Sequence, residues 1–344
     1  MPPVSIIITA HEQCDVLRRH LPAFLEQDYP ADYEVIVVDM NSTDDTLPML
    51  ENLQRRNPNL HIVCLPDSAR DVSPLRLALT LGIRSASNEW LVLSKADCIP
   101  ASPHWLSHMI STCEARPETQ IVLGQSRFVD GHGWHGLRCR FFRARQQWLH
   151  LHYAKRNGAY RCDGTNLCYR RSLFFEHRGF ADHANLLAGA TDIMVNHHST
   201  ARNTAVCTDP EAIILQDTPR NPDWWSRERL FFMETRRHFR HTFSYRLTYC
   251  LAAVLPWVCT LLIAAIVVVG LIYHNYIAVG LSLLVWLMYM GYITFSFNRH
   301  LKSIGEPSII ASLPLLLHLV PLWDTAAWLR WVFADKYIFK KRFI

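Results

Sequence analysis

The sequence predicts an α/β domain with a doubly wound sheet, followed by a helical membrane region. Over the first hundred residues, short apolar runs typical of buried strands alternate with amphipathic helical patterns. Further along, the roughly fifty residues from Leu247 to Asn298 contain no Asp, Glu, Lys or Arg, which is rare in a soluble domain. We therefore expect an α/β domain at residues 1–240 and a membrane region at residues 241–344.

The first part of the chain is expected to form four strands. Val4–Thr9 is a continuous run rich in β-branched residues, typical of a strand buried on both faces of a parallel sheet. Glu34–Asp39 is the second strand and ends on a carboxylate. The other expected elements are strands at 61–65 and 90–94 and helices at about 16–25, 46–56 and 73–87. Ligands of such sheets bind beyond the carboxyl ends of the strands, where Asp39 and Asp97 both fall.

The uncharged stretch divides at the polar segment 273–276 into two apolar segments, at about 249–272 and 277–297. Each exceeds the roughly 20 apolar residues that a helix needs to cross a bilayer, so the pair predicts a membrane hairpin. The basic residues Arg236, Arg237, Arg240, Arg246, Arg299 and Lys302 flank it, and the turn has none. By the positive-inside rule, the α/β domain is then cytoplasmic. A buried helical hairpin in a large soluble fold is the alternative.

A third apolar stretch, at about 309–333, is interrupted by two prolines and by Asp324 and Arg330. It is followed by a basic tail, so basic residues lie on both of its flanks. We expect an interfacial or re-entrant segment with its tryptophans at the level of the lipid headgroups. A third full span is the alternative.

Composition and motifs exclude several other classes of protein. The formal charge of +5 is too small to indicate nucleic-acid binding. GxxxxGK[ST] is absent, and the one GxGxxG match, Gly131–Gly136, does not follow the first predicted strand, which argues against P-loop and dinucleotide sites. The N-terminus does not resemble a signal peptide, and the 10 cysteines form no CxxC pair, so we expect reduced thiols. His197 and His198 are adjacent, a spacing that seldom lets two side chains share a metal ion.

Five segments, in order along the chain, resemble the motifs of family 2 glycosyltransferases, which have the GT-A fold, a Rossmann-like nucleotide-diphospho-sugar transferase fold. They are residues 4–12, 37–46, 91–100, 163–170 and 190–192. The resemblance covers about residues 3–240. It implies nucleotide contacts at Thr9, Ala10, Glu12, Asp39, Arg70, Asp71, Lys95 and Ala96, acceptor-side residues at Gly164, Asn166 and Arg227, a metal ligand at Asp97 and a catalytic base at Asp192. The arginine-rich segment around Arg227 could instead bind anionic lipid headgroups.

Two departures from the family pattern concern activity. Lys95 replaces the first carboxylate of the family's DxD segment, and Thr191 replaces the glutamate before Asp192. Lys95 could stabilise the leaving diphosphate and weaken the need for a metal, repel a divalent ion in a relative of low activity, or point to solvent. The QxxRW signature of processive members is not intact at residues 223–231, which disfavours a polysaccharide synthase.

The expected reaction needs a positive charge that compensates the leaving diphosphate and a base that takes the proton of the acceptor hydroxyl. Asp97 would coordinate Mg²⁺ or Mn²⁺ bridging the phosphates, although it could be only a turn or helix-cap residue. Asp192 would take the proton of the acceptor hydroxyl, with inversion at the anomeric carbon. Alternatively, it is the N-cap of a helix at 193–198, and a helix N-terminus would depress its pKa.

We therefore expect a non-processive, inverting glycosyltransferase with a sugar-nucleotide donor, more often UDP-linked than GDP- or dTDP-linked. Its expected acceptor is a glycan or a lipid-linked molecule in cell-envelope glycan synthesis. Its expected location is the bacterial inner membrane, multi-pass with a cytoplasmic catalytic domain, in contact with membrane lipids and other envelope-glycan enzymes and not with nucleic acid. The alternative is a non-catalytic GT-A-like nucleotide-binding or scaffold subunit.

Overall fold

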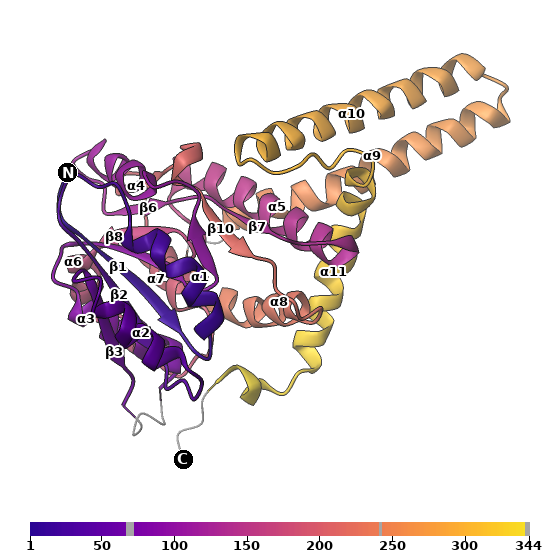
Figure 1. Ribbon diagram of the computed structural model, residues 1–344. Coiled ribbons are helices and arrows are strands. Elements are labelled where there is room, and N and C mark those ends of the chain that lie inside the picture. The colour runs from indigo at the N-terminus through magenta and orange to yellow at the C-terminus, as the bar shows by residue number, and fades with distance from the viewer. Residues whose placement is uncertain (67–71, 241–242, 341–344) are drawn as a thin grey trace. The chain divides into compact units, whose positions relative to one another are not determined.

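The computed structural model describes residues 1–66, 72–240 and 243–340 and divides the chain into two compact units (Figure 1). The first unit is Met1–Arg240 together with the described residues from Phe333 onward, and the second is His241–Val332. We expect the α/β domain to end at residue 240, and the first segment of the first unit ends at Arg240. The tail after 333, which we had assigned to the membrane region, belongs to the first unit.

The central sheet of the first unit has seven strands within the described residues, in the order β3-β2-β1-β4-β8-β6-β9. Their bounds are β1 (Val4–Ala10), β2 (Tyr33–Asp39), β3 (Leu60–Cys64), β4 (Trp90–Lys95), β6 (Ile121–Leu123), β8 (Leu167–Arg170) and β9 (Thr204–Val206). The four predicted strands are confirmed, each within one residue at either end, and pair in parallel. The antiparallel β8 lies between β4 and β6, so the sheet is mixed.

A smaller sheet has the order β5-β10-β7, with β5 (Cys98–Pro100), β7 (Ser126–Val129) and β10 (Ile214–Asp217). β10 runs antiparallel to β5 and parallel to β7. Because β5 begins directly after Asp97, this pairing brings the end of β10 beside the segment that follows β4.

Helices cover the central sheet on both faces. Those of the first unit are α1 (Cys14–Leu25), α2 (Thr46–Gln54), α3 (Pro74–Ser85), α4 (Trp105–Glu114), α5 (Gly133–Asn157), α6 (Arg171–Glu176), α7 (Ala190–His198) and α8 (Trp224–Thr235), with 3-10 turns η1 (Ala181–His183), η2 (Pro210–Ala212), η3 (Arg236–His238) and η4 (Lys336–Phe339). Ile6 and Ile8 of β1 pack into a core with α1 and α4, whereas Ile7 packs into a second core with α3. This alternation explains why the whole β1 run is apolar.

The second unit contains α9 (Phe243–Ile272), α10 (Tyr276–Ser303) and most of α11 (Leu313–Phe333). Of the described helices, α9 and α10 are long and apolar enough to cross a membrane, and only 11% of the most apolar window of each is buried. A core helix of a soluble protein would be mostly buried, so these exposed apolar surfaces favour the membrane interpretation. α11 is tied to α9 by polar contacts: Trp257 donates to the His318 carbonyl at 2.7 Å, and Tyr249 to Asp324 at 3.2 Å. That α11 is interfacial stays a prediction.

The tail after α11 packs against the loop that leads into α7. Phe339 is 1% exposed, and its ring centroid lies 5.4 Å from that of Phe231 in α8. The Leu187 N–H donates to the Phe339 carbonyl at 3.0 Å, and Leu186 forms a β-bridge with Lys340. Residues that follow the candidate membrane helices along the chain thus complete the first unit.

Candidate active site

Four of the predicted nucleotide contacts lie side by side at the carboxyl ends of the central strands: Thr9, Ala10, Asp39 and Lys95. Thr9 of β1 pairs with Lys95 of β4, and Ala10 of β1 pairs with Asp39 of β2. Because these strands are parallel, their carboxyl ends share one edge of the sheet. β8 is antiparallel to β4, so the residues preceding it reach the same edge.

The loops after β1 and β2 hold each other in place through polar side chains. The Glu12 N–H donates to the Ser42 hydroxyl at 2.9 Å, and the Glu12 carboxylate accepts from the Thr43 hydroxyl at 2.7 Å. Glu12 adopts a positive φ of 51°, so the chain turns sharply there. Asp39 is 2% exposed, and its carboxylate accepts from the Ser42 N–H at 3.1 Å. Both acids thus shape the loops, and their contact with a nucleotide stays a prediction.

The remaining predicted nucleotide contacts differ in how the structure places them. Thr9, Ala10 and Ala96 are buried at 8%, 0% and 2% exposure. Burial of their small side chains leaves mainly their backbone groups for a ligand. Arg70 and Asp71 lie outside the described residues.

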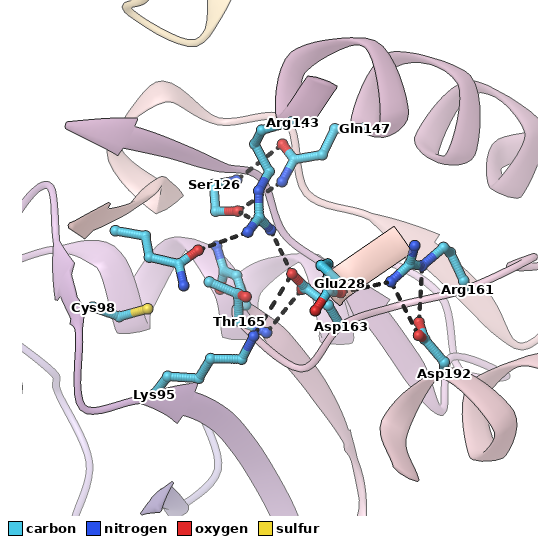
Figure 2. A network of polar contacts seen from close by, with 12 residues as sticks. Lys95, Cys98, Ser126, Arg143, Gln147, Arg161, Asp163, Thr165, Asp192 and Glu228 are labelled. Atoms are coloured by element: carbon cyan, nitrogen blue, oxygen red, sulfur yellow. Dashed lines mark hydrogen bonds and ion pairs between the residues drawn. The ribbon is translucent and has the colours of Figure 1, made fainter. Parts of the chain in front are cut away.

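Asp163, which we did not predict as a site residue, joins Lys95 to Arg143 of α5 (Figure 2). The Lys95 Nζ lies 3.8 Å from the Asp163 Oδ2, and Arg143 donates to the same oxygen. Burial raises the pKa of Asp163, but the charges of Lys95 and Arg143 outweigh burial and hold this pKa well below its usual range. Burial likewise opposes the charge on Lys95, but Asp163 raises the ammonium pKa above its ordinary value. Asp163 and Lys95 are therefore both ionised at neutral pH.

Asp97 is tied into the same network through β10. Its Oδ2 accepts from the Gln216 amide at 2.9 Å, and its Oδ1 accepts from the Cys98 thiol at 3.6 Å. The Gln216 Oε1 in turn accepts from Arg143 at 2.7 Å. A continuous chain of contacts thus runs from Asp97 through Gln216 and Arg143 to Asp163 and Lys95.

The donor groups around Asp97 do not form a divalent-cation site. Mg²⁺ and Mn²⁺ prefer several oxygen ligands, usually including carboxylates. In residues 1–66, 72–240 and 243–340, no group of three His, Cys, Asp or Glu side chains is placed to hold a metal ion. Position 95 supplies an ammonium instead of a carboxylate, and Asp163 is shared by two cations. Asp97 is left as a single candidate ligand, and a divalent cation in this chain stays a prediction.

On the acceptor side, Asp192 in the first turn of α7 forms a buried ion pair with Arg161. The Arg161 Nε and Nη2 each donate to one Asp192 oxygen at 3.1 Å, and the Asp192 side chain is 8% exposed. The Nη2 also lies 3.8 Å from the Glu228 Oε1 of α8 (Figure 2). The guanidinium carbon lies 4.1 Å from the centroid of the Phe232 ring. One cation is therefore shared by two carboxylates.

The environment of Asp192 corrects two expectations. The residue before α7 is Gly189, so Asp192 lies inside the first turn and is not the N-cap. The expected depression of its pKa by the helix N-terminus is wrong. Burial raises the pKa of Asp192 to about 6, because desolvation outweighs the opposing charge of Arg161. A carboxylate with this pKa is ionised at neutral pH and basic enough to act as a general base.

The three predicted acceptor-side residues have different surroundings. Gly164 has a φ of 74°, and a Cβ there would lie 2.9 Å from the Thr191 side chain, so glycine is required. Asn166 is 2% exposed; its amide donates to two backbone carbonyls at 2.8 Å and accepts from Trp105. Asn166 therefore stabilises the backbone that supports the site and is too buried to contact an acceptor directly. Arg227 is exposed on α8, and its contact with an acceptor stays a prediction.

A separate cluster of histidines surrounds the C-terminal half of α7. Its members are His177, His183, His197, His198 and His238. The rings of His177 and His198 stack at 3.8 Å, and those of His183 and His238 lie 4.8 Å apart. Burial lowers the pKa of both His183 and His198 to about 4, so these two side chains are neutral at pH 7.

The fold resembles that of a solved structure. It aligns with the mannosyltransferase PcManGT from Pyrobaculum calidifontis, solved in complex with GDP-Man and Mn²⁺, with a TM-score of 0.59 and 18% identity over 96% of this chain and 87% of that one. At this identity the likeness shows the fold alone, a GT-A-like α/β domain followed by long apolar helices.

Sequence comparisons give the family. The glycosyltransferase AglE of Haloferax volcanii is 31% identical over 136 residues, which are 39% of this chain and 42% of that protein. The probable glycosyltransferase YdaM of Bacillus subtilis is 23% identical over 318 residues, 84% of this chain and 71% of that protein. The family model for glycosyl transferase family 2 matches residues 5–177, about half of the chain. The protein thus belongs to glycosyl transferase family 2 and is a glycosyltransferase.

Proposed function

We propose that this glycosyltransferase is inverting and non-processive, and that it transfers one sugar from a nucleotide-sugar to a lipid-linked acceptor at the cytoplasmic face of a bacterial inner membrane. The observation that carries the proposal is the placement of Asp192 next to the strand-end network. The charge of Asp163 acts on Asp192, and that of Arg161 acts on Asp163, so both sets of contacts belong to one site.

In the proposed reaction, Asp192 acts as the general base. Arg161 occupies one lone pair of each Asp192 oxygen, which leaves a second lone pair on each for an acceptor hydroxyl. As the base takes the hydroxyl proton, the hydroxyl oxygen bonds to the anomeric carbon from the face opposite the nucleoside diphosphate. The bond to the diphosphate breaks with its electron pair, which inverts the anomeric configuration.

A single transfer per encounter is supported by the α8 segment. Trp224–Thr235 lacks the Gln and the Arg-Trp pair that processive family members carry at this place. The two candidate spans α9 and α10 also offer few helices with which to line a channel for a growing polymer.

A membrane-bound acceptor is supported by the second unit. Two apolar helices joined by a turn without Lys or Arg, with basic residues on their outer flanks, favour a multi-pass protein whose first unit is cytoplasmic. An enzyme anchored in this way would act on acceptors carried by the bilayer, such as the lipid-linked intermediates of capsule, exopolysaccharide or lipopolysaccharide assembly. Membrane lipids and other envelope-glycan enzymes are the partners we propose.

The donor is proposed to be UDP-linked. The solved mannosyltransferase binds GDP-Man, which supports a nucleotide-sugar donor without deciding the base. None of the proposed steps requires a divalent cation at Asp97.

The test is turnover of UDP-, GDP- and dTDP-sugars by the full chain in detergent, followed as release of the nucleoside diphosphate. Asp192→Asn is expected to lower turnover by about 10²–10⁴-fold, the usual contribution of a general base, and to leave donor binding unchanged. Asp15→Asn, at a carboxylate that is 92% exposed on α1, is the matched control. Donor binding with equal turnover in both variants would contradict the role of Asp192. Binding with no turnover in the unmodified protein would support the non-catalytic alternative.

A further inference from the structure

We propose that Lys95 takes the place of a divalent cation in holding the donor diphosphate, so that this protein binds its donor without metal. The inference rests on the proposed function, because it concerns how that site binds its nucleotide. It starts from the poor fit of Asp97 and its neighbours to a metal ion.

The first argument is the charge of the strand-end segment. Two carboxylates at positions 95 and 97 with one divalent cation would have a net charge of zero. Lys95 and Asp97 have the same net charge with no metal at all. A divalent cation bound at Asp97 would add two positive charges next to an ammonium, and that repulsion disfavours its binding.

The second argument is that Lys95 is kept charged and in place. Asp163, whose own pKa is held well below its usual range, stays ionised and lies 3.8 Å from the Lys95 Nζ. This contact holds the Lys95 side chain in place, and its ammonium can donate up to three hydrogen bonds to a diphosphate.

The third argument is accessibility. The Lys95 side chain is 37% exposed, whereas that of Arg143 is 10% exposed. Arg143 is engaged by Asp163 and Gln216, and its guanidinium lies 4.6 Å from the Phe128 ring centroid. Arg143 thus positions Asp163, while Lys95 is the cation that a ligand beyond the end of β4 can reach.

The fourth argument concerns the carboxylate that would remain for a metal. Each oxygen of Asp97 accepts one hydrogen bond, from Gln216 and from Cys98, so Asp97 offers a metal ion only its remaining lone pairs, and the described residues form no group of three metal-ligating side chains around it. With Asp163 shared between Lys95 and Arg143, the cluster formed by these side chains has its carboxylates paired within the protein.

The experiment is calorimetric binding of UDP, GDP and dTDP to the full chain in detergent, in EDTA, in Mg²⁺ and in Mn²⁺. The unmodified protein is expected to bind one nucleotide with the same affinity in all three conditions, within about twofold. Lys95→Met is expected to weaken binding about ten- to hundredfold in every condition, the usual effect of losing a hydrogen bond to a charged group. Lys155→Met, at an exposed lysine of α5, is the matched control.

Lys95→Asp restores two carboxylates and sharpens the test. Its binding is expected to be weak in EDTA and to recover in Mn²⁺. Binding by the unmodified protein that falls more than tenfold in EDTA would overturn the inference and leave the proposed function intact. Absence of binding by every nucleotide, with and without metal, would contradict both.

Discussion

The two sides of the site distribute charge in opposite ways. On the donor side, two cations, Lys95 and Arg143, share the carboxylate of Asp163. On the acceptor side, two carboxylates, Asp192 and Glu228, share the guanidinium of Arg161. The pKa of Asp163 is therefore lowered, whereas that of Asp192 is raised to about 6. Asp163 is thus a permanent anion and Asp192 a proton acceptor, because Asp192 is more deeply buried, at 8% exposure against 25%, and has fewer neighbouring cations.

The largest effect is expected from removing the shared cation of the acceptor side. Arg161→Met leaves Asp192 buried without its partner, and loss of one member of a buried ion pair costs about 3–5 kcal/mol of folding free energy. The pKa of Asp192 should also rise further, so turnover at pH 7 should fall. Denaturant unfolding measures the first effect, with Arg156→Met at an exposed position of α5 as control. Equal stability of the two variants would show that Asp192 does not depend on Arg161.

A smaller effect, on the pH dependence of turnover, is expected from removing the carboxylate of Glu228 next to Arg161 and Asp192. In the proposed mechanism the base is Asp192, with a pKa of about 6, so turnover should fall about tenfold per pH unit below 6 and level off above it. Glu228 contributes to the raised pKa of Asp192, so Glu228→Gln should move this acid limb to lower pH. The pH profile of nucleoside diphosphate release checks both, with Glu176→Gln on α6 as control. A limb that does not move would separate Glu228 from Asp192.

The smallest expected effect is a pH-dependent change in stability that comes from the histidine cluster. This cluster differs from both sides of the site because its titratable groups are mainly basic. The pKa of His183 and of His198 is about 4 in the folded protein and about 6.5 in an unfolded chain. Between these values the unfolded state binds more protons, so the free energy of unfolding should fall as the pH drops from 6.5 towards 4. Melting temperatures over this range should decrease less in His183→Gln than in the unmodified protein. His152→Gln, at an exposed residue of α5, should follow the unmodified protein; an equal decrease in all three would exclude His183 as a source of acid sensitivity.

The fold could be predicted further than the site. The apolar run of β1 and the carboxylate that ends β2 follow from period and position alone, and they place Asp39 and Asp97 at one edge of a sheet. The antiparallel β8 could not be predicted in this way, because its direction depends on the path of the chain between β4 and β8. Strand periodicity reports burial and contains no information on that path.

The paired charges of the site were missed for a related reason. Asp163 opened a segment that we had singled out, and Arg161 stands two residues before it, but neither spacing indicates an ion pair. Arg143 lies in a long helix among other arginines, with no motif to distinguish it. These side chains meet across 20 to 73 residues of sequence. Only the folded chain shows which of its many arginines faces a carboxylate.

The contact between Phe339 and the loop before α7 has a consequence for biosynthesis. Residues 1–240 leave the ribosome roughly 100 residues before Phe339, a delay of about 5–20 seconds at ordinary translation rates. Both candidate spans are made during that interval, and only afterwards can Phe339 cover Phe231 and pair with Leu187. The loop before α7 can therefore reach its final packing only after the helical hairpin has been synthesised. The order of synthesis itself would then keep this part of the first unit incomplete until both candidate spans have been made.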